Sequence, residues 1–510
     1  MRITKLKLKN FRSYQNEVKI VLNDLTVFVG KNDVGKSSIL EAVEIFINDG
    51  KGLIKIDSDD VNKAALAKGD NEVVITLVFE NLPQNLVLDA TNETNLADEY
   101  LLNAEGHLEV IKKFVNGGKP KVFIKANHPN NENCSNLLEK KITELRAILK
   151  EHNIECEDQT RSAVIRAAVW NHFSDDLRTE EREIDVSKGD TKAIWEKLNN
   201  YLPVYSLFQS DRKNSDSDNE VQDPMKLAVK QILSDTELIS TLNGVATEVH
   251  SKLTEVVNQT LEKLNEMNPG IADSLNPVIP SVDSLKWVDV FKNVSITGDE
   301  DIPINKRGSG VKRLILLNFF RAEAERRRIN QNTTSIIYAI EEPETSQHAE
   351  HQKILIDALK DLAGSENTQV ILTTHSASIV KKLEFDHIKL ITENDGVRNV
   401  SNVEPNQLPY PSLNEVNFVA FGDVSEEYHN ELYGFIEGEG LLDNYKDGKT
   451  TMPYVKELRN GGTANQDIIL TEYVRHQIHH PENTRNVRFT EMQLSESVRL
   501  MRTFIEDNFS

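Results

Sequence analysis

The stretch Gly30-Lys31-Asn32-Asp33-Val34-Gly35-Lys36-Ser37 decides the fold of this chain of 510 residues. It follows the pattern G-x-x-x-x-G-K-S, in which a glycine-rich loop joins a strand to a helix. The apolar run 25–29 has the length of a buried strand, and residues 38–46 have the apolar spacing of a helix. A chance glycine turn has no reason to lie between such neighbours. The pattern therefore predicts a phosphate-binding loop, called the P-loop below.

The residue types of the P-loop indicate how it would hold a nucleotide. Gly30 and Gly35 let the backbone turn tightly, so that its N–H groups can face phosphate oxygens. The N-terminus of the following helix adds the positive end of its dipole. We expect Lys36 to reach the β- and γ-phosphates and the Ser37 hydroxyl to bind Mg²⁺. The expected nucleotide-binding residues of the loop are Gly30, Asn32, Gly35, Lys36, Ser37 and Ser38.

Composition and charge narrow the class of protein. A hydrophobic content of 38% and a charged content of 27% are typical of a soluble globular chain. No run approaches the length of a membrane span, and residues 1–4 do not open a signal peptide, so we expect a cytoplasmic protein without a membrane partner. Cys134 and Cys156 are too few for a disulfide framework and are expected to be free thiols. The formal net charge of −22 argues against nucleic-acid binding by the whole surface but allows a local basic groove.

Two further strands are expected ahead of the P-loop, over residues 3–8 and 18–22, with a turn between them. A strand pair in this position can bring a side chain of the turn close to the nucleotide. Arg12 is the candidate for a phosphate or base contact. A surface arginine without a ligand is the alternative, and the residue pattern does not choose between them.

Two later stretches could reach the nucleotide from other directions. Gln209 lies near the end of the stretch 202–212, a predicted strand that ends in polar residues, where it could bridge Mg²⁺ or the attacking water, or have no ligand at all. The loop 307–313 carries Ser309 and Gly310 ahead of a predicted long helix, which makes a second anion site. Because the chain already has a P-loop, this second cradle suggests binding to the nucleotide of another copy. A glycine-rich helix cap without a ligand is the alternative.

Two strand ends supply the catalytic groups. The apolar strand 335–340 ends in Glu341 and Glu342, which point to opposite faces because they are adjacent. We interpret Glu341 as the carboxylate on the Mg²⁺ side and Glu342 as the base that orients or deprotonates the attacking water. The strand 370–374 leads to His375, which could donate a hydrogen bond to the γ-phosphate. The alternatives are a solvated acidic turn and a structural histidine.

The ordered set of these motifs resembles the ABC-type ATPase heads of the SMC/OLD superfamily, and Asn10-Phe11-Arg12 resembles the opening motif of that superfamily. The resemblance covers residues 1–400 and implies an α/β head, a mixed sheet with a P-loop core, that uses ATP and Mg²⁺. It implies a head-to-head dimer enclosing two ATP molecules, with Ser309 contacting the γ-phosphate across the interface. The stretch 345–348 would be the D-loop, and Glu341 stands where a Walker B aspartate is more usual, as in the OLD-like branch.

The resemblance and the predicted elements together suggest five parts. We expect the N-terminal part of the ATPase head at 1–90, an inserted helical lobe at 91–200, a strand and a short helical hairpin arm at 201–300, the C-terminal part of the head at 301–400, and a mainly helical C-terminal extension at 401–510.

Known relatives of this architecture limit the functions to consider. OLD-family nucleases follow the head with a Toprim domain, which needs a Glu and a later Asp-x-Asp. After His375, Glu437 and Glu439 are candidates for the Glu, but no Asp-x-Asp pair lies in strand context, so a built-in Toprim nuclease is not expected. Long arms of the SMC kind and a zinc-hook Cys-x-x-Cys are not found either. What remains resembles the PtuA family of Septu-type anti-phage ATPases, including retron-associated members. That resemblance implies a multimeric ATPase that senses infection and controls a partner HNH nuclease.

The extension offers a second possible active site. Helices are expected at about 425–438, 465–480 and 490–508, and in the second Arg475 and His480 have the R-x₄-H spacing that resembles the HEPN ribonuclease motif. His480 would do acid–base work and Arg475 would stabilise phosphate charge. A structural helix end, a metal site formed with His476, and a docking surface are the alternatives. Three functions therefore stay open: an ATPase that controls a separate nuclease, a self-contained ATPase–ribonuclease, and a DNA-repair ATPase of the RecF kind.

Overall fold

The computed structural model describes residues 1–50, 54–84, 86–89, 92–209, 233, 236–267, 318, 321–322, 325, 328–329, 335–345, 349–394, 397–404, 408–458 and 462–509. The chain forms two compact units, Met1–Ser210 with Ala324–Ser510, and Asp211–Glu323. The second unit thus begins ten residues later than the expected boundary at 201 and ends beyond 300. The expected loop 307–313 lies outside the described residues.

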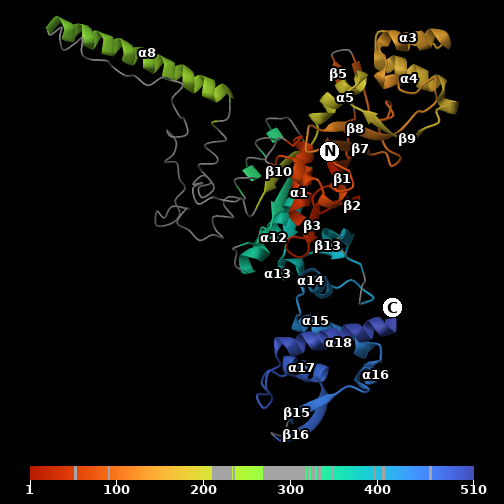
Figure 1. Ribbon diagram of the computed structural model, residues 1–510, viewed down its shortest axis with the longest axis vertical. Helices are drawn as coiled ribbons and strands as arrows, with labels where there is room; N and C mark the ends of the chain where they lie inside the picture. Colours follow the sequence, from red (N-terminus) through yellow and green to blue (C-terminus); the bar gives the residue numbers. More distant parts are fainter. Residues whose placement is uncertain are drawn as a thin grey trace. The chain divides into compact units, whose positions relative to one another are not determined.

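The first unit contains a sheet of parallel strands, as the run of buried apolar segments predicts. Its order is β10 (Val204–Phe208), β11 (Ile336–Glu341), β12 (Thr368–Thr374), β3 (Leu25–Val29), β13 (Ile388–Asn394) and β14 (Val397–Asn402). All but β14 run parallel. The strands β3, β10 and β12 are buried along their whole length, which is typical of parallel strands covered on both faces. Helix α1 (Lys36–Ile47) follows the P-loop and contacts β10, β11 and β12 (Figure 1).

A second sheet in this unit is antiparallel. Its order is β2 (Val18–Val21), β1 (Arg2–Lys9), β4 (Glu72–Glu80), β7 (Leu108–Val115), β8 (Lys121–His128) and β9 (Glu180–Asp185). The shorter elements around it are η1 (Ser58–Asp60), α2 (Lys63–Leu66), β5 (Leu86–Asp89), β6 (Asn92–Thr94), η2 (Leu137–Glu139), α3 (Ile142–Glu151), α4 (Ser162–His172), η3 (Ser174–Asp176) and α5 (Gly189–Asn199).

The inserted helical lobe expected at 91–200 contains strands as well as helices. The helices α3, α4 and α5 are present, but β7, β8 and β9 continue the sheet that β1 and β4 begin. Residues 108–115 form the strand β7 by pairing with β4, which lies about thirty-five residues earlier in the chain. Strand pairing between distant segments leaves a weaker local pattern than a helix does, because it depends on the neighbouring strand. The fold class itself, an α/β head of mixed sheets with a mainly helical C-terminal extension, is confirmed.

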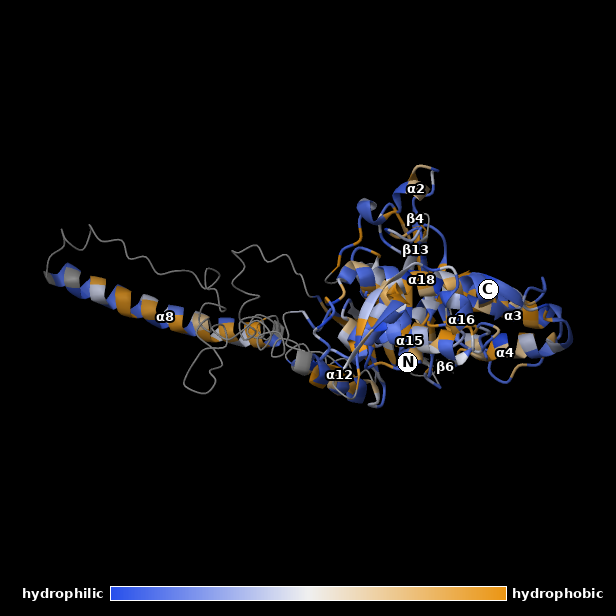
Figure 2. Cartoon of the chain, turned by 90° about the horizontal axis from the view of Figure 1, so that it is seen from below, coloured by the Kyte–Doolittle hydropathy of each residue, from blue (hydrophilic) through white to orange (hydrophobic). Residues whose placement is uncertain are grey.

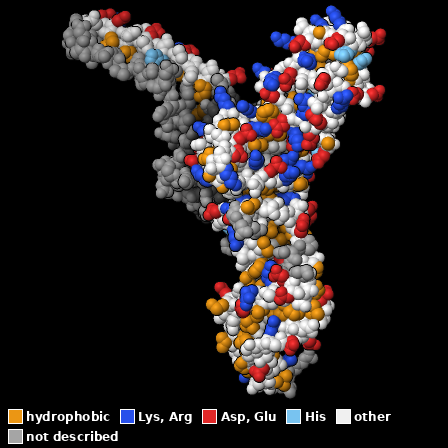
Figure 3. All heavy atoms as spheres, turned by 45° about the vertical axis from the view of Figure 1, so that its right-hand side comes forward, with side chains coloured by type: hydrophobic (Ala, Val, Ile, Leu, Met, Phe, Trp, Pro, Cys, Tyr) orange, Lys and Arg blue, Asp and Glu red, His pale blue; other side chains and the backbone are white. Residues whose placement is uncertain are grey.

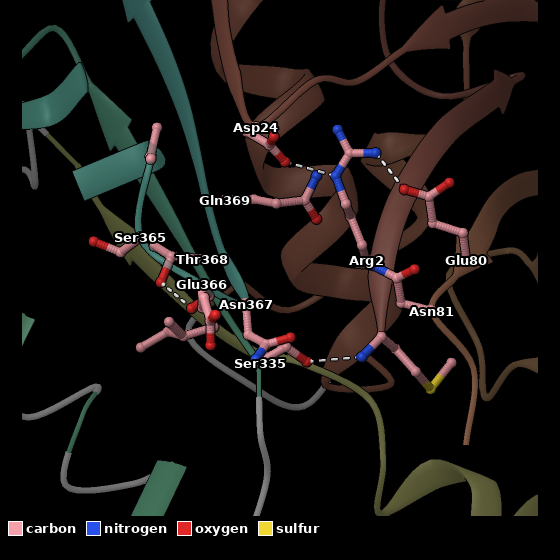
Figure 4. A pocket seen from close by; sticks show the side chains of 14 residues that line it. Arg2, Asp24, Glu80, Asn81, Ser335, Ser365, Glu366, Asn367, Thr368 and Gln369 are labelled. Carbon is pink, nitrogen blue, oxygen red and sulfur yellow. Dashed lines mark hydrogen bonds and ion pairs between the residues drawn. The ribbon is translucent and has the colours of Figure 1, made fainter. Parts of the chain in front are cut away.

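A buried glutamine joins the two sheets. Gln369, at the start of β12, accepts a hydrogen bond of 2.8 Å from the Ile3 backbone N–H and donates one of 2.9 Å to the Ile3 carbonyl. It lies beside a polar cavity of about 470 Å³, where Arg2 is held between Asp24 and Glu80 (Figure 4). This cavity opens at the amino ends of β11 and β12, away from the P-loop.

The rest of the first unit is mainly helical. It contains α12 (Ala349–Ala363), α13 (Ala377–Val380), η7 (Phe385–His387), α14 (Leu413–Phe421), α15 (Glu426–Gly438), α16 (Leu442–Lys446), β15 (Thr451–Glu457), β16 (Thr463–Ile469), α17 (Leu470–His479) and α18 (Glu491–Phe509). The expected helices at 425–438 and 490–508 correspond to α15 and α18. The expected helix at 465–480 is partly wrong, because residues 463–469 pair with β15 as a hairpin and the helix begins only at Leu470.

In the second unit the described residues centre on one long helix, α8 (Thr236–Met267), which agrees with part of the helical span expected there. Hydrophobic residues recur along this helix, as the colouring in Figure 2 shows, and Val245, Val249 and Val256 are each more than half exposed. Among the helices of the described residues, none is both long and apolar enough for a membrane span.

Candidate nucleotide-binding and catalytic site

The predicted site residues meet at one edge of the parallel sheet. The P-loop follows β3, Glu342 follows β11, His375 follows β12 and Gln209 follows β10. The register supports this meeting, since Phe208 pairs with Ile340 and Glu341 pairs with Thr373. Parallel strands place their carboxyl ends at the same edge, where α/β proteins bind ligands.

The P-loop has the backbone that its glycines predict. Gly35 has φ of 101° and forms the N-cap of α1, and Asp33 also lies in the left-handed region with φ of 62°. A side chain at Gly30 would place its Cβ only 2.7 Å from the carbonyl oxygen of Ile391 on β13. Tyr14 packs against Gly35 and donates a hydrogen bond of 3.1 Å to its carbonyl. The loop is therefore held between β13 and the turn that follows β1.

Lys36 lies within this loop with only 5% of its surface exposed. Its Nζ donates hydrogen bonds of 2.8 Å to the carbonyls of Gly30 and Lys31. Burial lowers the pKa of the Lys36 ammonium, and nearby carboxylates, Glu342 and Glu344 first among them, oppose that shift. A buried cation at the loop is the arrangement that a polyphosphate requires.

The residues present fit a magnesium ion. The Ser37 hydroxyl donates a short hydrogen bond to Glu341 Oε1, although the two residues are 304 positions apart in the chain. A hydroxyl and a carboxylate that meet beside a phosphate loop are oxygen ligands of the kind that Mg²⁺ prefers. Ser38, the next residue, is 8% exposed and lies inside the first turn of α1.

Glu342 and His375 form a pair beside this point. His375 Nδ1 lies 3.2 Å from Glu342 Oε1 and 3.6 Å from Glu344 Oε1. Glu342 has φ of 42°, and its backbone N–H donates to the Thr373 carbonyl at 3.1 Å. Glu344 is 3% exposed and accepts hydrogen bonds from Thr374 Oγ1 at 2.7 Å and from the His375 N–H at 3.1 Å. Glu344 therefore holds the turn after β11 against the end of β12.

Arg12 and Gln209 share a partner that the sequence did not single out. The Arg12 guanidinium pairs with Glu41 and donates from Nε to Asp60 Oδ1 at 2.7 Å. Gln209 Nε2 donates to Glu41 Oε1 at 2.9 Å. Burial lowers the pKa of Arg12, but Glu41 and Asp60 outweigh it and the net shift is upward. Glu41 follows Ser37 by one helical turn, so the i, i+4 spacing was a usable signal. The side chain of Asp60 meets Arg12 only through tertiary folding.

The family is identified by the stretch of sequence that contains this site. Residues 1–380 match the family described as an AAA ATPase domain. The chain belongs to the AAA ATPase domain family. The match includes the P-loop, Glu341, Glu342 and His375, so the site described above lies within the family's domain.

Several proteins are similar to this member of the family. Endonuclease GajA of Bacillus cereus (strain HuB5-5) is 22% identical, over 86% of this chain and 67% of its own length. The OLD nuclease of Thermus scotoductus is also 22% identical, over 47% of this chain and 43% of its own length. Among solved structures, an SMC head bound to the C-winged helix domain of ScpA is 17% identical, covering 79% of this chain and 98% of that chain, with a TM-score of 0.38. The SMC head domain from Thermotoga maritima is 13% identical over 79% of this chain and all of its own, with a TM-score of 0.33.

Some predicted site residues fall outside the described part of the chain. Ser309, Gly310 and residues 346–348 of the expected D-loop are outside the described residues. Asn32 is exposed and lines a cavity of about 420 Å³ between the P-loop, β13 and α14. The C-terminal extension therefore reaches the neighbourhood of the P-loop through α14.

The two residues of the expected ribonuclease motif contact different groups. Arg475 stacks over the Tyr433 ring at 3.9 Å and lies 3.4 Å from Glu437. His480 ends α17 and its Nδ1 lies 3.1 Å from Glu482 Oε1. His476 stacks on the Tyr454 ring instead. The described contacts therefore give each side chain a separate partner.

Proposed function

We propose that this chain binds and hydrolyses ATP at the edge of its parallel sheet. The observation that carries the proposal is the meeting of Ser37 with Glu341, next to the Glu342–His375 pair and the buried Lys36. These groups come from three separate strand ends and together match what phosphoryl transfer to water needs.

Each side chain then has a defined task. Lys36 exchanges its two loop carbonyls for the β- and γ-phosphate oxygens. Ser37 and Glu341 hold Mg²⁺, which supplies charge neutralisation of the phosphates when bound. Glu342 orients the attacking water and accepts its proton, and His375 hydrogen-bonds the γ-phosphate from its place between Glu342 and Glu344.

We also propose that hydrolysis occurs between two copies of the chain, as in the head-to-head dimers that the motifs resemble. Ser309 and Gly310 would contact the γ-phosphate held by the other copy. Light scattering tests this directly: ATP should double the mass of a Glu342→Gln variant, and Ser309→Arg in the same background should prevent that. A mass that ATP leaves unchanged would contradict the pairing.

The system that we propose is an anti-phage defence system of the Septu kind, in which the ATPase controls a partner nuclease similar to PtuB. Two similar proteins carry the names of nucleases, GajA and the OLD nuclease. The C-terminal extension offers a surface for a partner, because Val487 and Met492 are 83% and 81% exposed. Figure 3 shows hydrophobic side chains gathered over this region, which is the composition of a contact surface rather than of an ordinary solvated one.

Co-expression with the neighbouring gene products tests the partner. A nuclease subunit should co-purify with the chain, and Val487→Asp with Met492→Asp should release it while ATP hydrolysis continues. Protection of the host against phage should require both subunits. Full protection by the ATPase alone would favour a nuclease within this chain.

That second candidate has one specific observation in its favour. The alignment with GajA covers 86% of the chain, whereas the ATPase family match ends at residue 380. His480→Ala together with Arg475→Ala should abolish RNA cleavage and host toxicity if the extension is the effector. Unchanged cleavage would remove the ribonuclease from consideration.

A further inference from the structure

Glu41 connects two side chains of the proposed site. Its Oε1 accepts the 2.9 Å hydrogen bond from Gln209 Nε2, and its Oε2 pairs with Arg12 Nη1. The Glu41 side chain is 13% exposed, so this carboxylate lies mostly inside the protein. The P-loop pattern ends at Ser37 and assigns Glu41 nothing.

Glu41 is connected to the proposed magnesium ligands by two routes, one along α1 and one through Gln209. Ser37 and Glu41 are one turn apart on α1, and Ser37 donates to Glu341. Strands β10 and β11 pair in parallel with Phe208 opposite Ile340, so Gln209 and Glu341 follow as neighbours. Gln209 then returns to α1 through Glu41. Glu41 is therefore linked to the two residues that would hold Mg²⁺ along α1 on one side and through Gln209, the neighbour of Glu341, on the other.

A carboxylate is a selective partner for an amide. Ionised carboxylates only accept hydrogen bonds, whereas the Gln side chain has an NH₂ end that donates and an oxygen that accepts. Because Glu41 accepts a hydrogen bond from the Gln209 NH₂ group, the amide oxygen of Gln209 is the atom that can bind a cation. We propose that Glu41 is a positioning residue that turns the Gln209 oxygen toward the magnesium ion.

Arg12 stabilises the buried Glu41 carboxylate without occupying the oxygen that Gln209 uses. A carboxylate buried to this degree needs a compensating charge. The Arg12 guanidinium supplies this charge by pairing with Glu41 Oε2. The same guanidinium donates from Nε to Asp60 Oδ1 at 2.7 Å. The Oε1 atom is thereby left for Gln209. The inference rests on the proposed ATPase function, since it concerns how that site holds its metal.

The test measures binding of a fluorescent ATP analogue as Mg²⁺ is raised, and again in EDTA. In Glu41→Ala the Mg²⁺ concentration for half-maximal binding should rise roughly 10- to 100-fold, the usual effect of removing a partner that orients a metal ligand. Binding in EDTA should change less than about twofold. Glu41→Asp, which keeps the charge but draws the carboxylate back, should show the same rise and covers the case that Glu41→Ala does not fold.

Three further variants separate positioning from simple structural support. Gln209→Ala should reproduce the rise, and the double variant Glu41→Ala, Gln209→Ala should be no worse than either single one, because both remove the same oxygen. Arg12→Ala should weaken binding in Mg²⁺ and in EDTA alike. Glu44→Ala removes another buried glutamate of α1, which accepts from the Ile54 N–H, and should lower the melting temperature without changing the Mg²⁺ requirement.

The outcomes distinguish the two proposals. If the wild-type chain requires Mg²⁺ for tight binding and Glu41→Ala leaves that requirement unchanged, the role of Glu41 is overturned and the ATPase function stands. Equal losses in Mg²⁺ and EDTA would also overturn it, since Glu41 would then act through Arg12. A wild-type chain that binds no nucleotide would overturn both.

Discussion

Single side chains carry most of the chemistry proposed for this ATPase, and Lys36 is the simplest to test. Its Nζ already donates two hydrogen bonds of 2.8 Å to loop carbonyls, so it is placed where phosphate oxygens would lie. Lys36→Ala should weaken ATP binding roughly 100-fold, because a hydrogen bond from a charged group contributes about 1.5–3 kcal/mol. Isothermal titration calorimetry measures this change.

The control for Lys36 is Lys63→Ala. Lys63, the first residue of α2, has a side chain that is 76% exposed, and it pairs with Asp59. This variant should bind ATP as the wild type does. Equal affinity of Lys36→Ala and Lys63→Ala would mean that the P-loop does not hold the phosphates.

Local patterns were enough to predict the P-loop but not the groups that orient it. Gly35, Lys36 and Ser37 are specified by eight consecutive residues, and the loop geometry follows from them. The pairing of Ser37 with Glu341 could be predicted only because both belong to motifs of known order. The link between Arg12 and Asp60 depends on the fold between them, which no local spacing shows.

Hydrogen bonds between secondary-structure elements should contribute to the free energy of unfolding. Gln369, which bonds the start of β12 to the backbone of β1, is the clearest example. It makes two hydrogen bonds with the backbone of Ile3 and a third, of 3.3 Å, to the Asn23 carbonyl. Gln369→Ala should lower the free energy of unfolding by roughly 1–3 kcal/mol, because buried backbone groups lose their partners. Urea unfolding measures it. Thr368→Val, which removes only a local 3.3 Å bond to Glu366, should change stability much less. A smaller effect for Gln369→Ala than for Thr368→Val would contradict this role.

A buried polar chain in the C-terminal helices should make stability depend on pH. His429 on α15 is fully buried and bonds Ser497 on α18 at 2.9 Å, and Ser497 donates to Thr471 at 3.0 Å. Burial, and secondarily Arg475, lowers the pKa of His429 to about 4. The unfolded chain takes up a proton near its ordinary pKa of about 6.5, which the folded chain does not.

The sign of the effect follows from this difference. Stability is present above pH 6.5 and is lost as pH falls from about 6.5 to 4, by about 1.4 kcal/mol per pH unit for one histidine. His429→Gln should reduce the slope of unfolding free energy against pH in this window by one proton. Ser497→Ala breaks the same chain but keeps the histidine, so it should leave the slope in place. Burial also lowers the pKa of His128 to about 4, so His128 gives both variants a further dependence of the unfolding free energy on pH. An unchanged slope in His429→Gln would show that this histidine is not the source.

Elements were predicted unevenly along the chain. The strands β3, β11 and β12 were predicted because each is a short apolar run that ends in a motif residue. The strands β7 and β8 were missed because they depend on pairing with β4 rather than on a motif. The start of α17 was placed too early for the same reason, since β16 takes its conformation from β15.

At the scale of the first unit, the C-terminal extension contacts the proposed ATP site. Helix α14 packs on β13 and α13, and Asn417 donates to the Ala377 carbonyl at 3.3 Å, two residues after His375. The extension therefore contacts the elements next to both the P-loop and His375. We propose that a partner bound to the extension would sense the nucleotide through α14.

The most direct test of ATP hydrolysis at this site compares Glu342→Gln with the wild type. Nucleotide affinity should stay within about threefold, because Lys36, Ser37 and Glu341 are intact, while hydrolysis in a single turnover should slow by about 10²–10⁴-fold through loss of the base. Gln has the size of Glu, so the contact region around His375 is kept. Rapid-quench measurement with radiolabelled ATP gives both numbers. Hydrolysis at the wild-type rate in Glu342→Gln would contradict the assignment of the base and the proposed mechanism built on it.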